Sequence, residues 1–168
     1  MNTTKNNRWQ VQIRHCLNVR FLFSSELTKY MCFTNEIGIM FPVECINKLP
    51  IQFVEIQSIS VRGELGMISV YTCDYNPASR DPLCRIRRDK WETRFGPTEC
   101  ASSETRFTEL VFPVPLRLAP SQVAGIYIHS QLPSDTAIVY DNQRTNNVTY
   151  KDDILGIHPG IAHTSNVP

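Results

Sequence analysis

The sequence predicts an all-β fold: a two-sheet antiparallel β-sandwich of jelly-roll type, with about eight strands and little helix. Eleven prolines, seven glycines and several clusters of Asn, Asp and Ser divide the chain into short pieces. Most of these pieces are rich in Val, Ile, Phe, Tyr and Thr, which suit a pleated and half-buried surface. Turn signals recur about every 8–12 residues, a spacing that is typical of β-sandwiches and jelly rolls.

The first part of the chain shows no clean period. It contains a helix candidate at residues 24–31, with Ser24 as a possible cap, but this segment is too short to anchor a fold. Residues 1–34 are therefore expected to form either an N-terminal extension or a first strand. The β-sandwich domain is expected to span residues 35–168.

Residues 53–61 form the first long strand candidate of this domain. Their apolar positions change phase midway, which predicts a β-bulge or burial on both faces. Gly63 and Gly66 then frame a tight turn. Residues 67–73 are predicted to return as the partner strand of a β-hairpin.

A long polar stretch follows at residues 74–90 and is predicted to be a loop. Residues 91–95 form a short strand candidate, and Gly96 and Pro97 are predicted to turn the chain. Residues 98–105 are expected to be loop.

The clearest strand candidate spans residues 108–118. Pro113 and Pro115 cannot donate ladder hydrogen bonds, so this strand is predicted to lie at a sheet edge or to cross between sheets. Its apolar side chains recur at every second position and are predicted to share one face: Leu110, Phe112, Val114, Leu116 and Leu118.

Residues 123–130 form a second strong strand candidate, with Tyr127 and His129 on one face. Residues 136–140 are predicted to return as a strand, and residues 150–157 to form the last extended piece. The predicted core comprises Leu110, Phe112, Val123, Ile126, Ile128 and Val139.

Charge and hydropathy exclude several partners. The 17 Lys and Arg residues nearly balance the 16 Asp and Glu residues, so no overall field favours nucleic acid or an anionic membrane. The sequence has no stretch of about 20 apolar residues and no signal-peptide pattern at its start. We therefore expect no nucleic-acid or membrane partner, and a cytoplasmic or nuclear protein.

The six cysteines form no CxxC pair and no zinc-type spacing with histidine. All six are predicted to be free thiols. Cys73, Cys84 and Cys100 flank a loop region. A bridge between any two of them would instead indicate a secretory compartment and make the glycosylation sequons at Asn2 and Asn147 relevant.

The sequence contains no phosphate-binding Gly-rich loop, no GxSxG or HExxH motif and no dinucleotide fingerprint. We therefore expect no enzyme activity and no cofactor. The first hypothesis is a recognition module that binds a protein, peptide or glycan through loops at one end of the sandwich. The candidate binding residues lie in two polar loops: Arg85, Arg87, Arg88 and Trp91 in one, and Asp141, Asn142 and Arg144 in the other.

Other interpretations of these residues stay open. Acidic neighbours would largely cancel the arginine charges, and Asp141 and Asn142 would bond to their own turn. One alternative function is a metal-dependent jelly-roll enzyme that uses His158, His163 and Asp153. Another is a structural or assembly subunit. If neither loop binds a partner, the sheet face that carries Tyr127 and His129 is the next candidate.

A characteristic order of elements runs through residues 35–163. It comprises Gly38-Ile39-Met40-Phe41, the segments 53–61 and 67–72, the central Trp91, the proline-containing segment 112–118 and Gly125-Ile126-Tyr127-Ile128. This order resembles the PHR-type jelly-roll modules that accompany ubiquitin ligases and adaptor proteins. The resemblance implies recognition without catalysis, and it assigns no binding residue.

Overall fold

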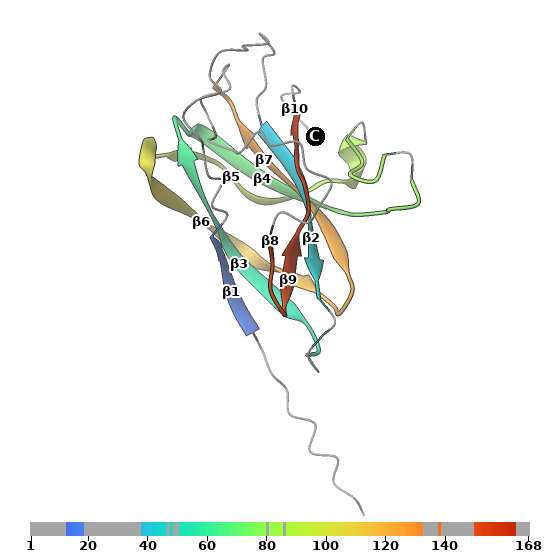
Figure 1. Ribbon diagram of the computed structural model, residues 1–168. Coiled ribbons are helices and arrows are strands. Elements are labelled where there is room, and N and C mark those ends of the chain that lie inside the picture. The colour runs from blue at the N-terminus through green and yellow to red at the C-terminus, as the bar shows by residue number, and fades with distance from the viewer. Residues whose placement is uncertain are drawn as a thin grey trace, which may run out of the picture.

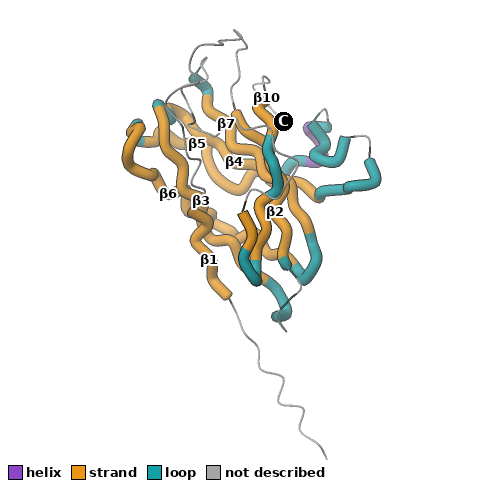
Figure 2. Tube along the Cα trace, in the orientation of Figure 1, coloured by secondary structure: helices purple, strands orange, loops and turns teal. Residues whose placement is uncertain are grey.

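The protein is a two-sheet β-sandwich, as predicted. The computed structural model describes residues 13–18, 38–46, 48, 51–79, 81–85, 87–132, 138 and 150–163. These residues form ten strands and one 3-10 turn, with the strands arranged in two sheets (Figures 1 and 2). The elements are β1 (Ile13–Asn18), β2 (Gly38–Cys45), β3 (Val54–Gly63), β4 (Gly66–Asp74), η1 (Arg88–Lys90), β5 (Glu92–Cys100), β6 (Ser103–Leu118), β7 (Val123–Ser130), β8 (Tyr150–Lys151), β9 (Leu155–Ile157) and β10 (Ile161–His163).

The smaller sheet has the order β1-β3-β6. β6 runs antiparallel to β3, whereas β1 runs parallel to β3, so this sheet is not purely antiparallel. The larger sheet has the order β5-β4-β7-β2-β9-β8, and β10 also pairs with β2. β9 pairs with residues 43–45 of β2 and β10 with residues 38–40, so these two short strands follow each other along one edge of β2.

The main core lies between the two sheets, because each sheet turns one apolar face toward the other. Alternate residues of each strand supply it, as the period of two in an extended chain requires. Its most deeply buried side chains include Phe41, Ile56, Ile59, Ile68, Leu110, Leu118, Ile126 and Ile128.

β6 confirms most of the alternation predicted for residues 108–118. It lies at an edge of the smaller sheet, as its two prolines require. The register shifts between Ile56 and Ser58, so that Gln57 of β3 faces residues 112–115 of β6. This bulge holds both prolines and turns Val114 outward, where it is 63% exposed. The prediction that Val114 shares the buried face is therefore wrong.

The prediction that residues 53–61 and 67–73 form a β-hairpin is also wrong. β3 belongs to the smaller sheet and β4 to the larger one, so the connection between them crosses from sheet to sheet. Gly63 and Gly66 both have positive φ, at 137° and 59°, which allows the sharp change of direction. The phase change predicted within the first strand is confirmed as a β-bulge, located after Ile56.

The predicted turn at Gly96 and Pro97 is a bulge inside β5. Gly96 has φ 76°, and a Cβ at this position would clash with the carbonyl oxygen of Ile68. The register between β4 and β5 shifts at this point, and the strand then continues to Cys100. Most of the loop expected at residues 98–105 is therefore strand.

The C-terminal segment differs from its prediction as well. Residues 150–157 form two short strands, β8 and β9, which pair antiparallel with each other. The Asp152 carboxylate accepts hydrogen bonds from the backbone of Ile154 and Leu155, both at 2.7 Å, and so closes the turn between them. β10 was not expected at all.

The predicted core is confirmed at Leu110, Phe112, Ile126 and Ile128. Val123 is only half-buried, because it lies at the first position of β7. Three predictions cannot be compared with the described residues: Val139 as a core residue, the strand at residues 136–140, of which only Ile138 is described, and the helix candidate at residues 24–31. Within the described part of the chain, no helix is long and apolar enough to cross a bilayer.

Candidate functional site

The connection between β4 and β5, residues 75–91, folds onto the outer face of the larger sheet. Figure 2 shows it as the teal segment with a short purple turn beside the strands. Under it lies a second hydrophobic cluster, separate from the sandwich core, which we call the outer cluster. It consists of Met40, Cys73, Leu83, Trp91 and Tyr127, with Tyr71, Tyr75 and Cys84 packed at its border.

Trp91 anchors the end of this loop. Its indole Nε1 donates a hydrogen bond to the carbonyl oxygen of Cys84 at 3.0 Å, and its ring contacts the edge of the Tyr127 ring at 5.9 Å between centroids. Tyr127 is fully buried, and this burial raises the pKa of its hydroxyl. Both aromatic side chains thus hold the loop against the sheet.

Gly125 of β7 makes the close approach of the loop possible. A Cβ at this position would lie 2.7 Å from the Cys73 Sγ atom and 3.0 Å from Cδ2 of Leu83. A glycine inside an apolar strand is the sequence signal for such an approach. Sequence reasoning missed its role in positioning the loop.

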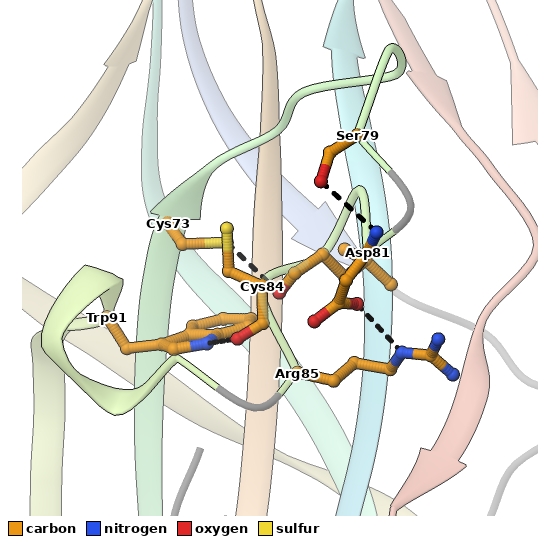
Figure 3. A network of polar contacts seen from close by, with 7 residues as sticks. Cys73, Ser79, Asp81, Cys84, Arg85 and Trp91 are labelled. Atoms are coloured by element: carbon orange, nitrogen blue, oxygen red, sulfur yellow. Dashed lines mark hydrogen bonds and ion pairs between the residues drawn. The ribbon is translucent and has the colours of Figure 1, made fainter.

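Hydrogen-bonded turns organise the loop itself (Figure 3). The backbone N–H of Asn76 donates to the carbonyl oxygen of Pro82 at 3.1 Å, and that of Cys84 donates to the carbonyl oxygen of Asp81 at 3.0 Å. The Ser79 hydroxyl oxygen accepts the Asp81 N–H at 3.1 Å. These bonds satisfy backbone groups that strand pairing leaves unpaired in a connection of this length.

Acidic neighbours neutralise Arg85 and Arg87, as their positions in the sequence predicted. Asp81 pairs with Arg85 at 2.9 Å, and Asp89 accepts two hydrogen bonds from Arg87. The Arg87 guanidinium lowers the pKa of the Asp89 carboxyl through these bonds.

Arg88 and Lys90 differ from these arginines. Both side chains are exposed in the 3-10 turn η1, and no acidic group in the described part of the chain forms an ion pair with either of them. Lys90 was not among the predicted binding residues. The 3-10 turn therefore presents two exposed cations on a hydrogen-bonded backbone.

Trp91 has a different environment from the one the sequence suggested. The sequence placed it beside the arginines as an aromatic surface, but the side chain is 9% exposed and belongs to the outer cluster. The Trp91 side chain packs between the loop and the larger sheet, and it does not present its ring face to a ligand.

The second predicted loop lies outside the described residues, so the structure does not place Asp141, Asn142 or Arg144. The face that carries Tyr127 and His129 is placed, and both side chains are buried, at 0% and 3% exposure. That face is therefore not an exposed binding surface.

The alternative metal ligands have other partners. Asp153 forms an ion pair with Lys48 at 3.0 Å, and Nε2 of His158 lies 3.0 Å from a carboxylate oxygen of Glu44. The backbone of His163 lies in β10, and its side chain is outside the description. Among the described residues, no group of three or more His, Cys, Asp or Glu side chains is arranged to hold a metal ion.

The four cysteines with described side chains, Cys45, Cys73, Cys84 and Cys100, are free thiols, as predicted. Cys45 and Cys100 lie in the core between the sheets, whereas Cys73 and Cys84 belong to the outer cluster and its border. The side chain of Cys16 and all of Cys32 are outside the described residues.

Comparisons with known protein families, with curated proteins and with solved structures yield no match for this chain.

Proposed function

We propose that the chain is a non-enzymatic recognition module of jelly-roll type that binds a protein or peptide through the 75–91 loop. A glycan is a further possible ligand class for such a loop. The observation that carries the proposal is the second hydrophobic cluster beneath this loop. A connection longer than about 12–15 residues is uncommon in a compact domain and is often functional. Here a buried tryptophan and successive turns hold such a connection in place.

The exposed cations favour an acidic partner. Arg88 and Lys90 remain available after Asp81, Asp89 and Glu92 have paired with the other arginines. Such cations bind carboxylate or phosphate groups through charge-assisted hydrogen bonds. A fixed backbone lowers the entropy cost of ordering the loop on binding. An acidic or phosphorylated peptide segment is therefore the partner class that the loop suits best.

This proposal agrees with the role that the PHR-type resemblance implies, which is recognition without catalysis. The balanced charge of the whole chain supports a local contact and not a general affinity for nucleic acid or membranes. We propose a cytoplasmic or nuclear location. Neither the metal-dependent enzyme nor the assembly subunit has a specific observation in its favour within the described residues.

An array of acidic, phosphorylated and neutral peptides tests the proposal. The wild-type domain is expected to bind acidic or phosphorylated peptides with an affinity that falls as salt rises. The double variant Arg88→Ala/Lys90→Ala is expected to bind them at least about tenfold more weakly, because a hydrogen bond to a charged group contributes about 1.5–3 kcal/mol.

The matched control is Arg106→Ala/Lys151→Ala. It removes two exposed basic side chains outside the loop, on β6 and β8, and should leave the affinity unchanged. Thermal unfolding of both variants checks that the fold is intact. Equal losses in the two double variants, or binding that salt does not weaken, would contradict the proposal.

A further inference from the structure

Two thiols meet at the base of the 75–91 loop. Cys73 lies next to the end of β4, and Cys84 lies in the loop. Figure 3 shows the Cys73 and Cys84 side chains pointing toward each other, and Cys84 packs at the border of the outer cluster that contains Cys73. The Cys73 thiol also donates a weak hydrogen bond to the carbonyl oxygen of Leu83, the residue before Cys84, at 3.5 Å. The loop and the strand are thus in contact through these two cysteines.

The backbone holds Cys84 in an unusual conformation. Its φ is 50°, in the left-handed region that side chains other than glycine rarely adopt. Hydrogen bonds hold it there: its N–H donates to the Asp81 carbonyl, and its own carbonyl accepts both the Arg87 N–H, at 2.9 Å, and the Trp91 indole N–H. The strained residue is therefore the one that places its thiol beside Cys73.

We propose that Cys73 and Cys84 are a redox pair: they stay reduced in a reducing compartment and form a reversible disulfide, which fastens the 75–91 loop to β4, when conditions become oxidising. Unlike a permanent bridge, such a transient bridge does not indicate a secretory compartment. The inference does not depend on what the loop binds, because it concerns only how the loop is attached.

The chemistry needs an oxidant, and a low-molecular-weight disulfide such as glutathione disulfide supplies it. Cys84 is the more exposed of the two thiols and attacks first, as its thiolate. This step forms a mixed disulfide on Cys84 and releases one glutathione thiolate. The Cys73 sulfur then attacks the Cys84 sulfur, forms the Cys73–Cys84 bond and releases the second glutathione. In total the protein loses two protons and two electrons, and the glutathione disulfide gains them as it becomes two glutathione thiols.

Burial explains why Cys84, and not Cys73, attacks the glutathione disulfide first. It raises the pKa of the Cys73 thiol to about 12, so this thiol is a poor first nucleophile toward an oxidant in solution. Once Cys84 carries the mixed disulfide, the Cys73 thiol has an electrophile beside it, and the departing glutathione thiolate accepts the proton that Cys73 gives up.

The other described cysteines are not placed to form a disulfide with Cys73 or Cys84. Cys45 and Cys100 lie in the core between the sheets, whereas Cys73 and Cys84 lie on the outer side of the larger sheet. Burial raises the pKa of both core thiols as well. A bridge from Cys73 to Cys100 would have to pass through the sheet.

Oxidation of the folded protein with glutathione disulfide tests the proposal. Remaining thiols are blocked with N-ethylmaleimide in acid, and the protein is digested with trypsin and analysed by mass spectrometry. Arg80 lies between the two cysteines in the sequence, so trypsin places them on separate peptides, residues 63–80 and 81–85. We expect an intact mass lower by two hydrogens, these two peptides joined by a disulfide, and a higher melting temperature for the oxidised form.

Variants make the result specific. Cys84→Ser is expected to abolish the bridge, and the matched control Cys100→Ser is expected to form it as the wild type does. If Cys84→Ser folds poorly, Cys84→Gly removes the thiol and suits the left-handed backbone. Oxidised protein in which Cys84 stays as a glutathione adduct, in which both thiols stay free, or in which Cys73 pairs with another cysteine would overturn the proposal. None of these outcomes affects the peptide-binding proposal, which the charged-loop variants test.

Discussion

Truncation of Trp91 is the sharpest test of the outer cluster. The side chain is 9% exposed, packs against Tyr127 and donates its indole hydrogen bond to Cys84. Replacing a buried tryptophan by alanine costs about 3–5 kcal/mol, which includes the loss of packing and the cavity that remains. For a chain of this length, a loss of 1 kcal/mol lowers the melting temperature by about 2–4 °C. Trp91→Ala is therefore expected to lower it by roughly 6–20 °C.

Trp91→Phe separates packing from hydrogen bonding. Phenylalanine retains much of the ring contact with Tyr127 but lacks the indole N–H. The Cys84 carbonyl still accepts the Arg87 N–H, so it is not left without a partner. We expect a loss of about 1–2 kcal/mol from this variant, well below that of Trp91→Ala.

Urea unfolding followed by circular dichroism measures these losses, and native-state hydrogen exchange shows whether the loop detaches first. The amides of Cys84, Arg87 and Lys90, which are hydrogen-bonded within the loop, should lose protection in Trp91→Ala. Phe107→Ala is the control, because Phe107 is an exposed aromatic residue on β6. A loss below about 1 kcal/mol for Trp91→Ala, with the loop amides as protected as in the wild type, would refute the anchoring role.

Two further predictions concern the main core and the outer thiol. Phe112→Ala should cost about 3–5 kcal/mol in urea unfolding, because Phe112 is 4% exposed, whereas the neighbouring and exposed Val111→Ala should cost less than about 0.5 kcal/mol. Comparable losses for the two variants would contradict the assigned phase of β6. The pKa of Cys73 is raised from 9.0 to about 12 in the folded protein, so folding favours its neutral thiol. The contribution of the neutral Cys73 thiol to the free energy of unfolding is complete below pH 9. As the pH rises toward 12, this contribution is lost by up to about 1.4 kcal/mol per pH unit. Urea unfolding across this range should therefore show a shallower decline in Cys73→Ala than in the wild type, and equal slopes would refute the argument.

Local patterns in the sequence were enough to predict the strands that carry the core. In residues 108–118, apolar side chains alternate with a period of two, and this alternation identifies the buried side chains of β6 with the exception of Val114. In residues 123–130, the alternation identifies Ile126 and Ile128 but not the burial of Tyr127 and His129 on the other face. The prolines of β6 restrict it to an edge because they lack N–H donors, which is also a local property. The neutralisation of Arg85 and Arg87 was predictable because Asp81 and Asp89 lie only four and two residues away.

The pairing of strands required the tertiary structure. A tight turn at Gly63 and Gly66 is compatible with a hairpin and with a crossing between sheets, because both begin with the same reversal of the chain. Ile59 of β3 and Ile68 of β4 are equally apolar in either arrangement. Only the pairing of β3 with β6 and of β4 with β7 decides that these residues enter the same core from opposite sheets.

Local sequence patterns could not predict the outer cluster either, because it depends, like the strand pairing, on contacts between distant segments. An aromatic residue next to arginines has the same sequence signature whether its ring faces solvent or a sheet. Trp91 is buried because the loop folds back over Gly125, a residue more than thirty positions later in the chain. The same long-range contact brings Cys84 to Cys73. Local sequence patterns predict most of the extended segments, the polar loop after β4 and the cancellation of charges within it. Contacts between distant segments, which no local pattern records, decide which surfaces pack against each other. They therefore also decide which thiols meet and which aromatic side chains are buried.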